Sequence, residues 1–157
     1  MISVTKDFTF DAAHRLVRNY DGKCAHLHGH TYHVYITVAL RSKEQASMLS
    51  GSEEPTLDQY GFVEDFDKIK IVKRWVDENW DHATIVNHED TLLLLWLSAN
   101  KQKKYPIFIG NGNPTVENMC KVLFGECVKQ LSTDRVYVHE VKIYETPTSC
   151  ASYSESN

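Results

Sequence analysis

The sequence has 157 residues, the size of one ordinary domain, and its 17 basic and 21 acidic side chains give a net charge of −4 with histidine neutral. A hydrophobic content of 42% and a charged content of 24% are those of a globular protein, which excludes disordered and fibrous classes. A net acidic chain is a poor candidate for sequence-independent nucleic-acid binding, and no run reaches the roughly 18 apolar residues that cross a membrane.

The cysteines indicate a reducing compartment. The four of them lack the density and spacing of a secreted disulfide framework. The N-terminus passes directly into alternating polar and apolar residues, unlike a signal peptide. We therefore expect free thiols and a cytoplasmic location.

Two stretches with period-two alternation predict strands. From Ile2 to His14 the even positions form an apolar face that ends in His14, and the even positions from His30 to Leu40 form another. The Asp-Gly pair within Asn19 to Lys23 predicts a loop between them. We expect the two strands to pair antiparallel.

Two helices are predicted further along the chain. The stretch from Arg41 to Tyr60 has no periodicity, so we expect a solvent-exposed loop there. Apolar residues then recur at steps of three and four from Phe62 to Trp80, which predicts a helix that ends near Asn79. A second helix is expected to start at Asn113-Pro114, with the asparagine as its cap. Its apolar stripe is Val116, Met119, Cys120, Leu123, Cys127 and Leu131.

The remaining segments complete an α+β domain over 1–157. Alternation from Arg135 to Glu145 predicts a last strand, with Tyr137, His139, Val141, Ile143 and Glu145 on one face. Residues 83–112 follow no single pattern, and Leu92 to Leu97 fits either a short buried helix or a strand. We interpret 83–112 as an insertion and the serine-rich end, 151–157, as a flexible tail. This order of elements predicts an antiparallel sheet with helices.

Three histidines fall on the apolar faces of the first two strands. His28 and His30 are two residues apart and therefore point to the same side of a strand, and His14 ends the apolar face of the other strand. A buried imidazole costs desolvation free energy unless a partner satisfies it, and three histidines with an open fourth position are typical of catalytic zinc. The pattern indicates a metal site about as readily as three structural histidines. His26 has the same phase and competes for a ligand position.

Other residues with reactive side chains flank this cluster in the sequence. Cys24 lies four residues before His28, and a thiol near a cation deprotonates readily and becomes a base or nucleophile. A buried structural cysteine and a fourth metal ligand are the alternatives. Asp81 and His82 follow the first helix, and a carboxylate beside an imidazole orients the ring for proton transfer, although such pairs also arise by chance.

Glu145 places a carboxylate on the apolar phase of the last strand. A buried carboxylate needs a partner, and the N–H and amino edge of a guanine or pterin ring suits it. The alternative is a strand-end residue that is already in water.

Five motifs occur in order and span nearly the whole chain. They are Phe10-Asp-Ala-Ala-His14-Arg15, Cys24-x-x-x-His28-Gly-His30, Asp81-His82, Asn113-Pro-Thr115-x-Glu117-Asn118 and Tyr144-Glu145-Thr146. With this set the sequence resembles the 6-pyruvoyl-tetrahydropterin synthase superfamily. The three residues between Cys24 and His28 are similar to the spacing in the bacterial 6-carboxytetrahydropterin branch of that superfamily.

The resemblance implies a fold and roles for the site residues. The fold would be the tunnelling (T-) fold, an α+β fold whose antiparallel sheet carries two helices on one face. Subunits would join their sheets into a barrel, as a homo-oligomer (a hexamer) with sites at subunit interfaces. The implied roles are zinc binding by His14, His28 and His30, proton abstraction by Cys24, a second proton transfer by Asp81 with His82, and pterin binding by Glu145 with Thr115.

The implied activity converts 7,8-dihydroneopterin triphosphate to 6-carboxy-5,6,7,8-tetrahydropterin, acetaldehyde and triphosphate, on the 7-deazaguanine route to queuosine. The alternatives are the 6-pyruvoyl reaction on the same substrate and a non-catalytic zinc- or pterin-binding module. Binding of the triphosphate requires cations, for which Lys6, Lys23 and Arg15 lie near the site in sequence. The segment 83–112 is longer than in short bacterial relatives and therefore bears on the pocket edge and on subunit contacts.

Overall fold

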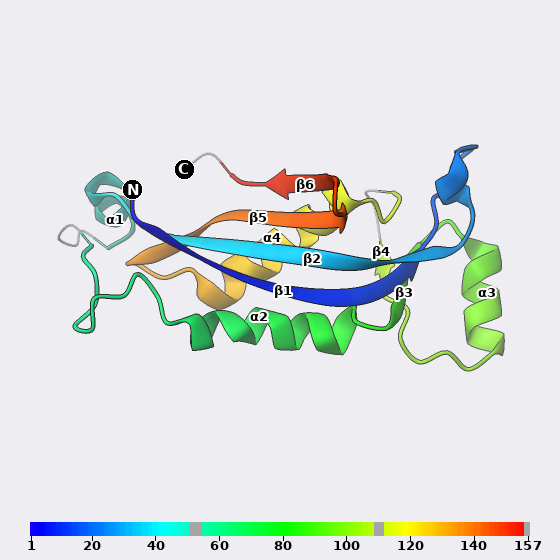
Figure 1. Cartoon of the computed structure of the whole chain (residues 1–157), viewed down its shortest axis with the longest axis horizontal. Coiled ribbons are helices and arrows are strands. Elements are labelled where there is room, and N and C mark those ends of the chain that lie inside the picture. Colours follow the sequence, from blue (N-terminus) through cyan, green and yellow to red (C-terminus); the bar gives the residue numbers. More distant parts are fainter. Residues whose placement is uncertain (51–54, 109–111, 156–157) are drawn as a thin grey trace.

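A six-stranded sheet in the order β4-β3-β1-β2-β5-β6 forms the frame of the computed structural model, which describes residues 1–50, 55–108 and 112–155. The strands are β1 (Ser3–His14), β2 (His28–Leu40), β3 (Ala83–Asn87), β4 (Ile107–Phe108), β5 (Val136–Thr146) and β6 (Ser149–Tyr153). The helices are the 3-10 turn η1 (Lys23–Ala25), α1 (Lys43–Ser50), α2 (Phe66–Asn79), α3 (Thr91–Ala99) and α4 (Val116–Leu131). The sheet is curled, and α3 stands at one end of it (Figure 1).

The long pair β1 and β2 confirms the predicted antiparallel pairing. The register runs from Ser3 opposite Ala39 to His14 opposite His28. Phe8 and Phe10 of β1 face the core together with Tyr32 of β2, as the alternation predicts. This pairing places the last residue of β1 and the first of β2 side by side.

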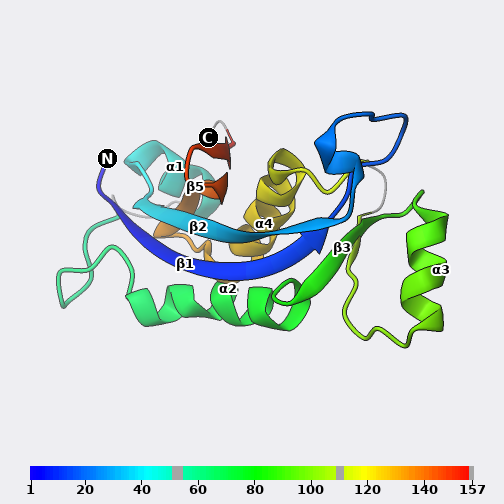
Figure 2. The ribbon, with the colours of Figure 1, turned by 45° about the vertical axis from the view of Figure 1, so that its right-hand side comes forward.

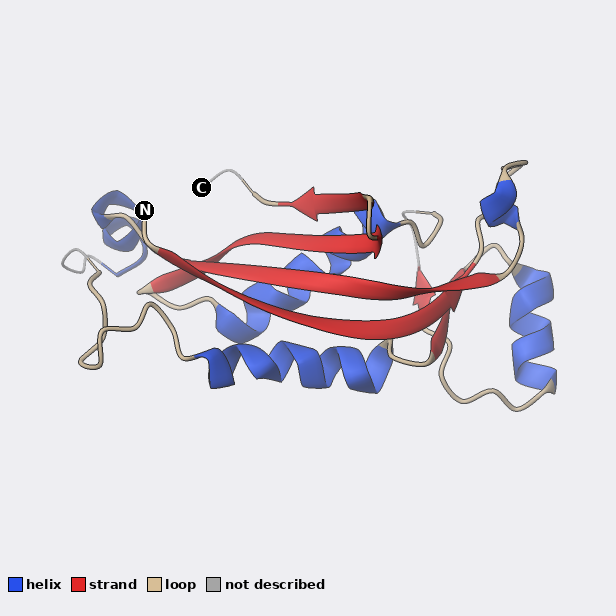
Figure 3. Ribbon diagram, viewed as in Figure 1, coloured by secondary structure: helices blue, strands red, loops and turns tan. Residues whose placement is uncertain are grey.

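Helices α2 and α4 cover the apolar face of the sheet (Figure 3). A single core cluster joins Ile69, Val72 and Val76 of α2 to the α4 stripe and to the inner positions of β1, β2 and β5. The buried α4 residues are Met119, Cys120, Leu123, Phe124, Cys127 and Leu131. The expectation of two helices on one face is therefore confirmed.

The expectation of a wholly antiparallel sheet is wrong for two strands. Strand β3 pairs parallel to β1, with Ala12 opposite Ala83, and β4 pairs parallel to β3. Strand β2 is antiparallel to β1, and β3, the next strand along the chain, runs antiparallel to β2, so β3 has the direction of β1. The chain then passes from β3 to β4 through α3, a crossover of the kind that joins parallel strands. Residues 83–87, which we expected within an insertion, therefore belong to the central sheet. Leu92 to Leu97 lies in α3, the helical alternative.

Two segments are more regular than expected. The expected loop from Arg41 to Tyr60 is wrong over α1, where the Ser42 hydroxyl accepts from the Gln45 N–H at 3.3 Å and the Gln45 side chain accepts from the Ser42 N–H at 2.7 Å. This is a capping box, which a Ser-x-x-Gln sequence can signal. The expected flexible tail is wrong up to Tyr153, because Ala151 and Tyr153 pair with β5. Residues 156–157 lie outside the described part.

The helix starts differ from the prediction because different side chains cap them. Asp65 caps α2 by accepting from the Asp67 N–H at 2.8 Å, so the helix starts at Phe66 rather than at Phe62. Thr115 caps α4 in place of Asn113, because its hydroxyl accepts from the backbone N–H of Asn118 at 3.4 Å. The Asn113 side chain instead binds the backbone of Val17.

A β-bulge in β5 reverses the predicted face for half of the strand. Glu140 lies opposite Thr37 and Val138 opposite Val38, so His139 is an extra residue in the ladder. One extra residue moves every preceding side chain to the other face. Val136 and Val138 therefore join Val141 in the core, and Tyr137 and His139 do not share its face.

No helix in the described ranges is long and apolar enough to cross a bilayer. The connection between β1 and β2 lies at the same end of the sheet as α3 (Figure 2). This end also holds the three histidines.

Candidate metal centre and pocket

The three histidines predicted to share a face converge at the end of β1 and the start of β2. One ring nitrogen from each of His14, His28 and His30 lies within 4.8 Å of the other two. The Nε2 atoms of His14 and His28 are 3.2 Å apart. Their closeness follows from the register, because His14 is directly opposite His28 and His30 is two residues further along the same face.

The other nitrogens of two rings are fixed by backbone carbonyls. His14 Nδ1 donates to the carbonyl of Pro114 at 2.7 Å, and His28 Nδ1 donates to the carbonyl of His26 at 2.7 Å. A carbonyl only accepts, so both rings carry their proton on Nδ1 when neutral. Their Nε2 lone pairs then face each other, an arrangement that a shared cation stabilises. The competitor His26 contributes its carbonyl to this arrangement.

His30 supplies a third free nitrogen. Its Nε2 is buried and has no hydrogen-bond partner among the residues that the structure describes, a costly state for a polar atom. Burial lowers the pKa of His14 against the opposing effects of the Pro114 carbonyl and Glu145, and burial also lowers the pKa of His30. Neutral imidazole is the form that binds metals. The donor set fits a cation with three nitrogen ligands.

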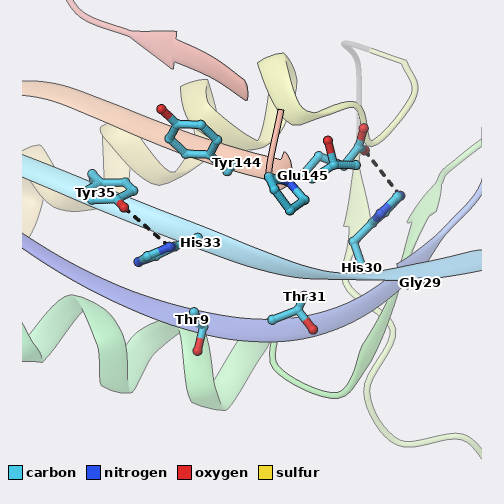
Figure 4. Close-up of a pocket in the computed structure, with 10 residues that line it drawn as sticks. Thr9, Gly29, His30, Thr31, His33, Tyr35, Tyr144 and Glu145 are labelled. Carbon is cyan, nitrogen blue, oxygen red and sulfur yellow. Dashed lines mark hydrogen bonds and ion pairs between the residues drawn. The ribbon is translucent and has the colours of Figure 1, made fainter. Parts of the chain in front are cut away.

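Glu145 connects the histidines to a cavity of about 780 Å³. Its Oε1 lies 3.5 Å from His14 Nε2 and 3.7 Å from His30 Nε2. Figure 4 shows the Glu145–His30 contact at one side of the pocket, with Thr9, Thr31, His33, Tyr35 and Tyr144 along the rest of it. The carboxylate can therefore serve a group bound in the cavity while it contacts the metal site.

Cys24 lies in η1, on the loop that enters β2. It is half-buried, and its carbonyl accepts from the Leu16 N–H at 2.8 Å. The negative charge of a Cys24 thiolate raises the pKa of Tyr20, which places the thiol close to that hydroxyl. The structure thus holds Cys24 in the connection between His14 and His28.

Asp81 and His82 form the predicted pair directly before β3. His82 Nδ1 lies 2.8 Å from Asp81 Oδ2, and Asp81 Oδ1 accepts from the Asp11 N–H at 3.0 Å. Burial would raise the pKa of Asp81, but the hydrogen bonds from Asp11 and His82 outweigh it and lower that pKa. The His82 side chain is 78% exposed and lines a pocket with Asp11 and Thr31, whose side chains have the opposite phase to those of His14 and His30. The pair therefore belongs to the other face of the sheet. His30 also lines this pocket.

Thr115 adjoins the cluster through its neighbour in the chain. It caps α4, and the preceding Pro114 carbonyl holds His14. The expected phosphate-binding cation Arg15 has a different partner, because both its Nε and its Nη2 donate to Asp90 at 2.5 Å.

Tyr32 is a site residue that our reading of the sequence missed. It is 0% exposed, and its ring lies edge-on to those of His14 and His30, with centroids 6.2 and 5.5 Å apart. Within the described part of the chain its buried hydroxyl has no hydrogen-bond partner. Burial raises the pKa of this hydroxyl, and so do the charges of Glu145 and Cys24. The strand alternation could have identified it, because Tyr32 lies two residues after His30 and therefore on the same face of β2 as His28 and His30.

A curled sheet with helices on one face and three imidazoles at one end defines a T-fold protein with a candidate metal centre. Residues 3–156 match the family model described as 6-pyruvoyl tetrahydropterin synthase, so the chain belongs to that family.

Relatives of known name agree with this assignment. The chain is 33% identical to the 6-carboxy-5,6,7,8-tetrahydropterin synthase of Rickettsia bellii, covering 94% of this chain and 96% of the relative. It is 31% identical to the synthase of the same name from Bacillus subtilis, covering 96% and 83%. The chain is therefore an enzyme, a pterin synthase of the lyase type.

Solved structures share the fold. An uncharacterized protein from Wolinella succinogenes superposes with a TM-score of 0.76 at 23% identity, covering 99% of this chain and 98% of that one. The 6-pyruvoyl tetrahydropterin synthase of Caenorhabditis elegans superposes with a TM-score of 0.65 at 23% identity, covering 99% and 96%.

Proposed function

We propose that the chain converts 7,8-dihydroneopterin triphosphate to 6-carboxy-5,6,7,8-tetrahydropterin, acetaldehyde and triphosphate. The observation that carries the proposal is the set of three ring nitrogens. The Nε2 lone pairs of His14 and His28 face each other beside the Nε2 of His30, which makes no hydrogen bond to any described residue. The product is chosen because relatives at 31% and 33% identity bear the name of that synthase.

His14, His28 and His30 would hold zinc. Three neutral imidazoles with an open fourth position suit that ion better than the oxygen-binding cations. Zinc bound there supplies stabilisation of negative charge on substrate oxygens. The carbonyls of Pro114 and His26 keep two of the rings in the ligating tautomer.

The remaining residues bind the ring and move protons. Glu145 accepts hydrogen bonds from the N–H and amino edge of the pterin in the cavity, assisted by Thr115 near the start of α4. Cys24 as thiolate takes a proton from a side-chain carbon of the substrate. Asp81 holds the Nδ1 proton of His82 and so leaves Nε2 of that ring free to receive or return a proton.

The proposal includes a homo-oligomer, a hexamer, with sites at subunit interfaces. The support is the position of the Asp81–His82 pair, which lies toward the opposite sheet face and is open to a neighbouring chain. The pair of one subunit would then act at the histidine cluster of another. We place this enzyme in the cytoplasm, on the 7-deazaguanine route to queuosine.

A product assay tests the activity. Zinc-loaded protein with 7,8-dihydroneopterin triphosphate should release acetaldehyde together with a carboxylated pterin, both identified by mass spectrometry. Cys24→Ala should lower kcat by about a hundredfold or more. Cys150→Ala, at a thiol exposed on β6, is the matched control and should leave kcat unchanged.

Two outcomes would contradict the proposal. A product that keeps the whole side chain, without acetaldehyde, would assign the 6-pyruvoyl reaction. Zinc binding without turnover would assign a non-catalytic binding module.

A further inference from the structure

Two arginines that follow His14 are held by two acids between β3 and α3. Arg15 donates through Nε and Nη2 to the two carboxylate oxygens of Asp90 at 2.5 Å each, and Asp90 is only 5% exposed. Arg18 donates through Nε and Nη2 to Glu89 at 2.6 and 2.9 Å, with both side chains 45% exposed. Paired N–H donors on a carboxylate fix orientation as well as distance.

The Asn113 side chain hydrogen-bonds to both backbone groups of Val17, which lies between Arg15 and Arg18 in the sequence. Its Oδ1 accepts from the Val17 N–H at 2.8 Å, and its Nδ2 donates to the Val17 carbonyl at 3.0 Å. The same Oδ1 accepts from Asn87 Nδ2 at 3.0 Å. Gly112 has φ of +92°, and a Cβ added there would lie 2.9 Å from Arg18 Nη1, so the glycine leaves room for that guanidinium.

These contacts hold the segment between β1 and β2, which carries Cys24. Leu16 N–H donates to the Cys24 carbonyl at 2.8 Å, which joins the start of the segment to η1. Arg18 and Asn19 adopt left-handed φ values of 66° and 60°, a conformation that persists only where surrounding contacts enforce it. The path from His14 to Cys24 is therefore set by side chains of the β3–α3 connection and of the start of α4.

We propose that Asp90, acting through Arg15, is a positioning residue that fixes the loop carrying Cys24. The β3–α3 connection then contributes to proton abstraction although Asp90 does not touch the substrate. This inference rests on the role of Cys24 in the proposed function. Loss of the Asp90 charge should loosen the loop and displace the thiol, and small displacements of a reacting group reduce rate steeply.

The test compares Asp90→Asn with Glu89→Gln, the same chemical change at the adjacent, exposed pair. The first readout needs no substrate: iodoacetamide labelling of the full-length zinc-loaded protein, with the Cys24 and Cys150 peptides resolved by mass spectrometry. In Asp90→Asn we expect the Cys24 labelling rate to rise about fivefold or more, because local opening exposes it. Cys150 is the internal control. Glu89→Gln should change the Cys24 labelling rate by less than about twofold, because the Arg18–Glu89 pair is 45% exposed on both sides and such pairs contribute little to stability.

The second readout is kinetic. Asp90→Asn should lower kcat about tenfold or more with KM nearly unchanged, because the pterin anchor Glu145 is untouched. Zinc stoichiometry should stay at the wild-type value. If Asp90→Asn does not fold, Arg15→Lys serves instead, since it keeps the charge and loses the two-point contact.

Wild-type Cys24 labelling in a folded Asp90 or Arg15 variant would overturn the positioning role. Failure of the proposed activity is recognised separately, because the wild-type protein would then release no acetaldehyde. The labelling comparison would still report on the loop.

Discussion

At the residue scale, the buried Asp90 carboxylate and its partner Arg15 form an ion pair whose contribution to stability can be measured directly. Burial alone would raise the pKa of Asp90, but the hydrogen bonds from Arg15 and Leu93 and the charge of Arg15 outweigh it and lower that pKa. A carboxyl group with a lowered pKa in the folded state stabilises the fold above its ordinary pKa of 3.8. That stabilisation is lost as the pH falls through the lower folded value.

Asp90→Asn should therefore cost about 2 kcal/mol of the free energy of unfolding at pH 7, because it leaves Arg15 without its charged partner. The difference from wild type should shrink as the pH falls below 3.8, because the carboxyl group of the unfolded chain takes up a proton there, and the rest is lost once the folded carboxyl group is protonated at its lower pKa. Urea unfolding at pH 7 and at about pH 3 measures both values. An equal difference at the two pH values would show that the charge of Asp90 is not the cause.

The residues of the site could be predicted to different degrees. The shared face of His14, His28 and His30 could be predicted because strand alternation is local. The Arg15–Asp90 pair could not, because 75 positions separate the two residues and only the parallel pairing of β3 with β1 brings them together. Asn113 was assigned a local capping role, but a contact 96 positions away determines its side chain.

At the element scale, the start of α4 determines where one histidine points. Thr115 caps the helix directly after Pro114, whose carbonyl fixes the His14 ring. A shift of this helix start would release that hydrogen bond. The cap is therefore part of the support for the metal centre.

Thr115→Ala should lower the free energy of unfolding by about 1 kcal/mol through loss of the cap. Thr115→Ser keeps the hydroxyl and should stay close to wild type. Denaturant unfolding of the two variants in the absence of metal provides the comparison. Equal destabilisation by alanine and serine would indicate that the methyl group matters rather than the hydroxyl.

The elements that were predicted correctly have strong local periodicity, and the errors have physical causes. β1, β2 and the stripes of α2 and α4 follow from repeated apolar spacing. The face of β5 before Glu140 was wrong because a bulge adds one residue. The short α1 was missed because it is mostly exposed, although Ser42 and Gln45 carry a recognisable cap.

At the scale of the whole molecule, the described helices α2 and α4 both cover the same face of the sheet (Figure 3). The other face presents polar side chains such as Thr5, Asp7, Thr9 and Asp11, and the Asp81–His82 pair is joined to it through Asp11. In the proposed oligomer a site takes Cys24 from one subunit and His82 from another. Two inactive variants should therefore complement each other in a mixed oligomer, which a monomeric enzyme would not allow.

Cys24→Ala and His82→Ala should each be inactive alone and active when refolded together. At equal amounts, random assembly gives about one quarter of the wild-type kcat per site, since half of the subunits carry each intact residue. The assay is acetaldehyde release by the mixture, with each variant refolded alone as the control. A mixture as inactive as its components would show that both residues act within one chain.

The most direct test of the central claim is an anomalous-scattering map from crystals of the zinc-loaded protein, recorded at the zinc absorption edge. The account predicts one strong peak about 2.0–2.1 Å from a ring nitrogen of each of His14, His28 and His30. Crystals grown with one equivalent of zinc that show no peak among these three rings would contradict it.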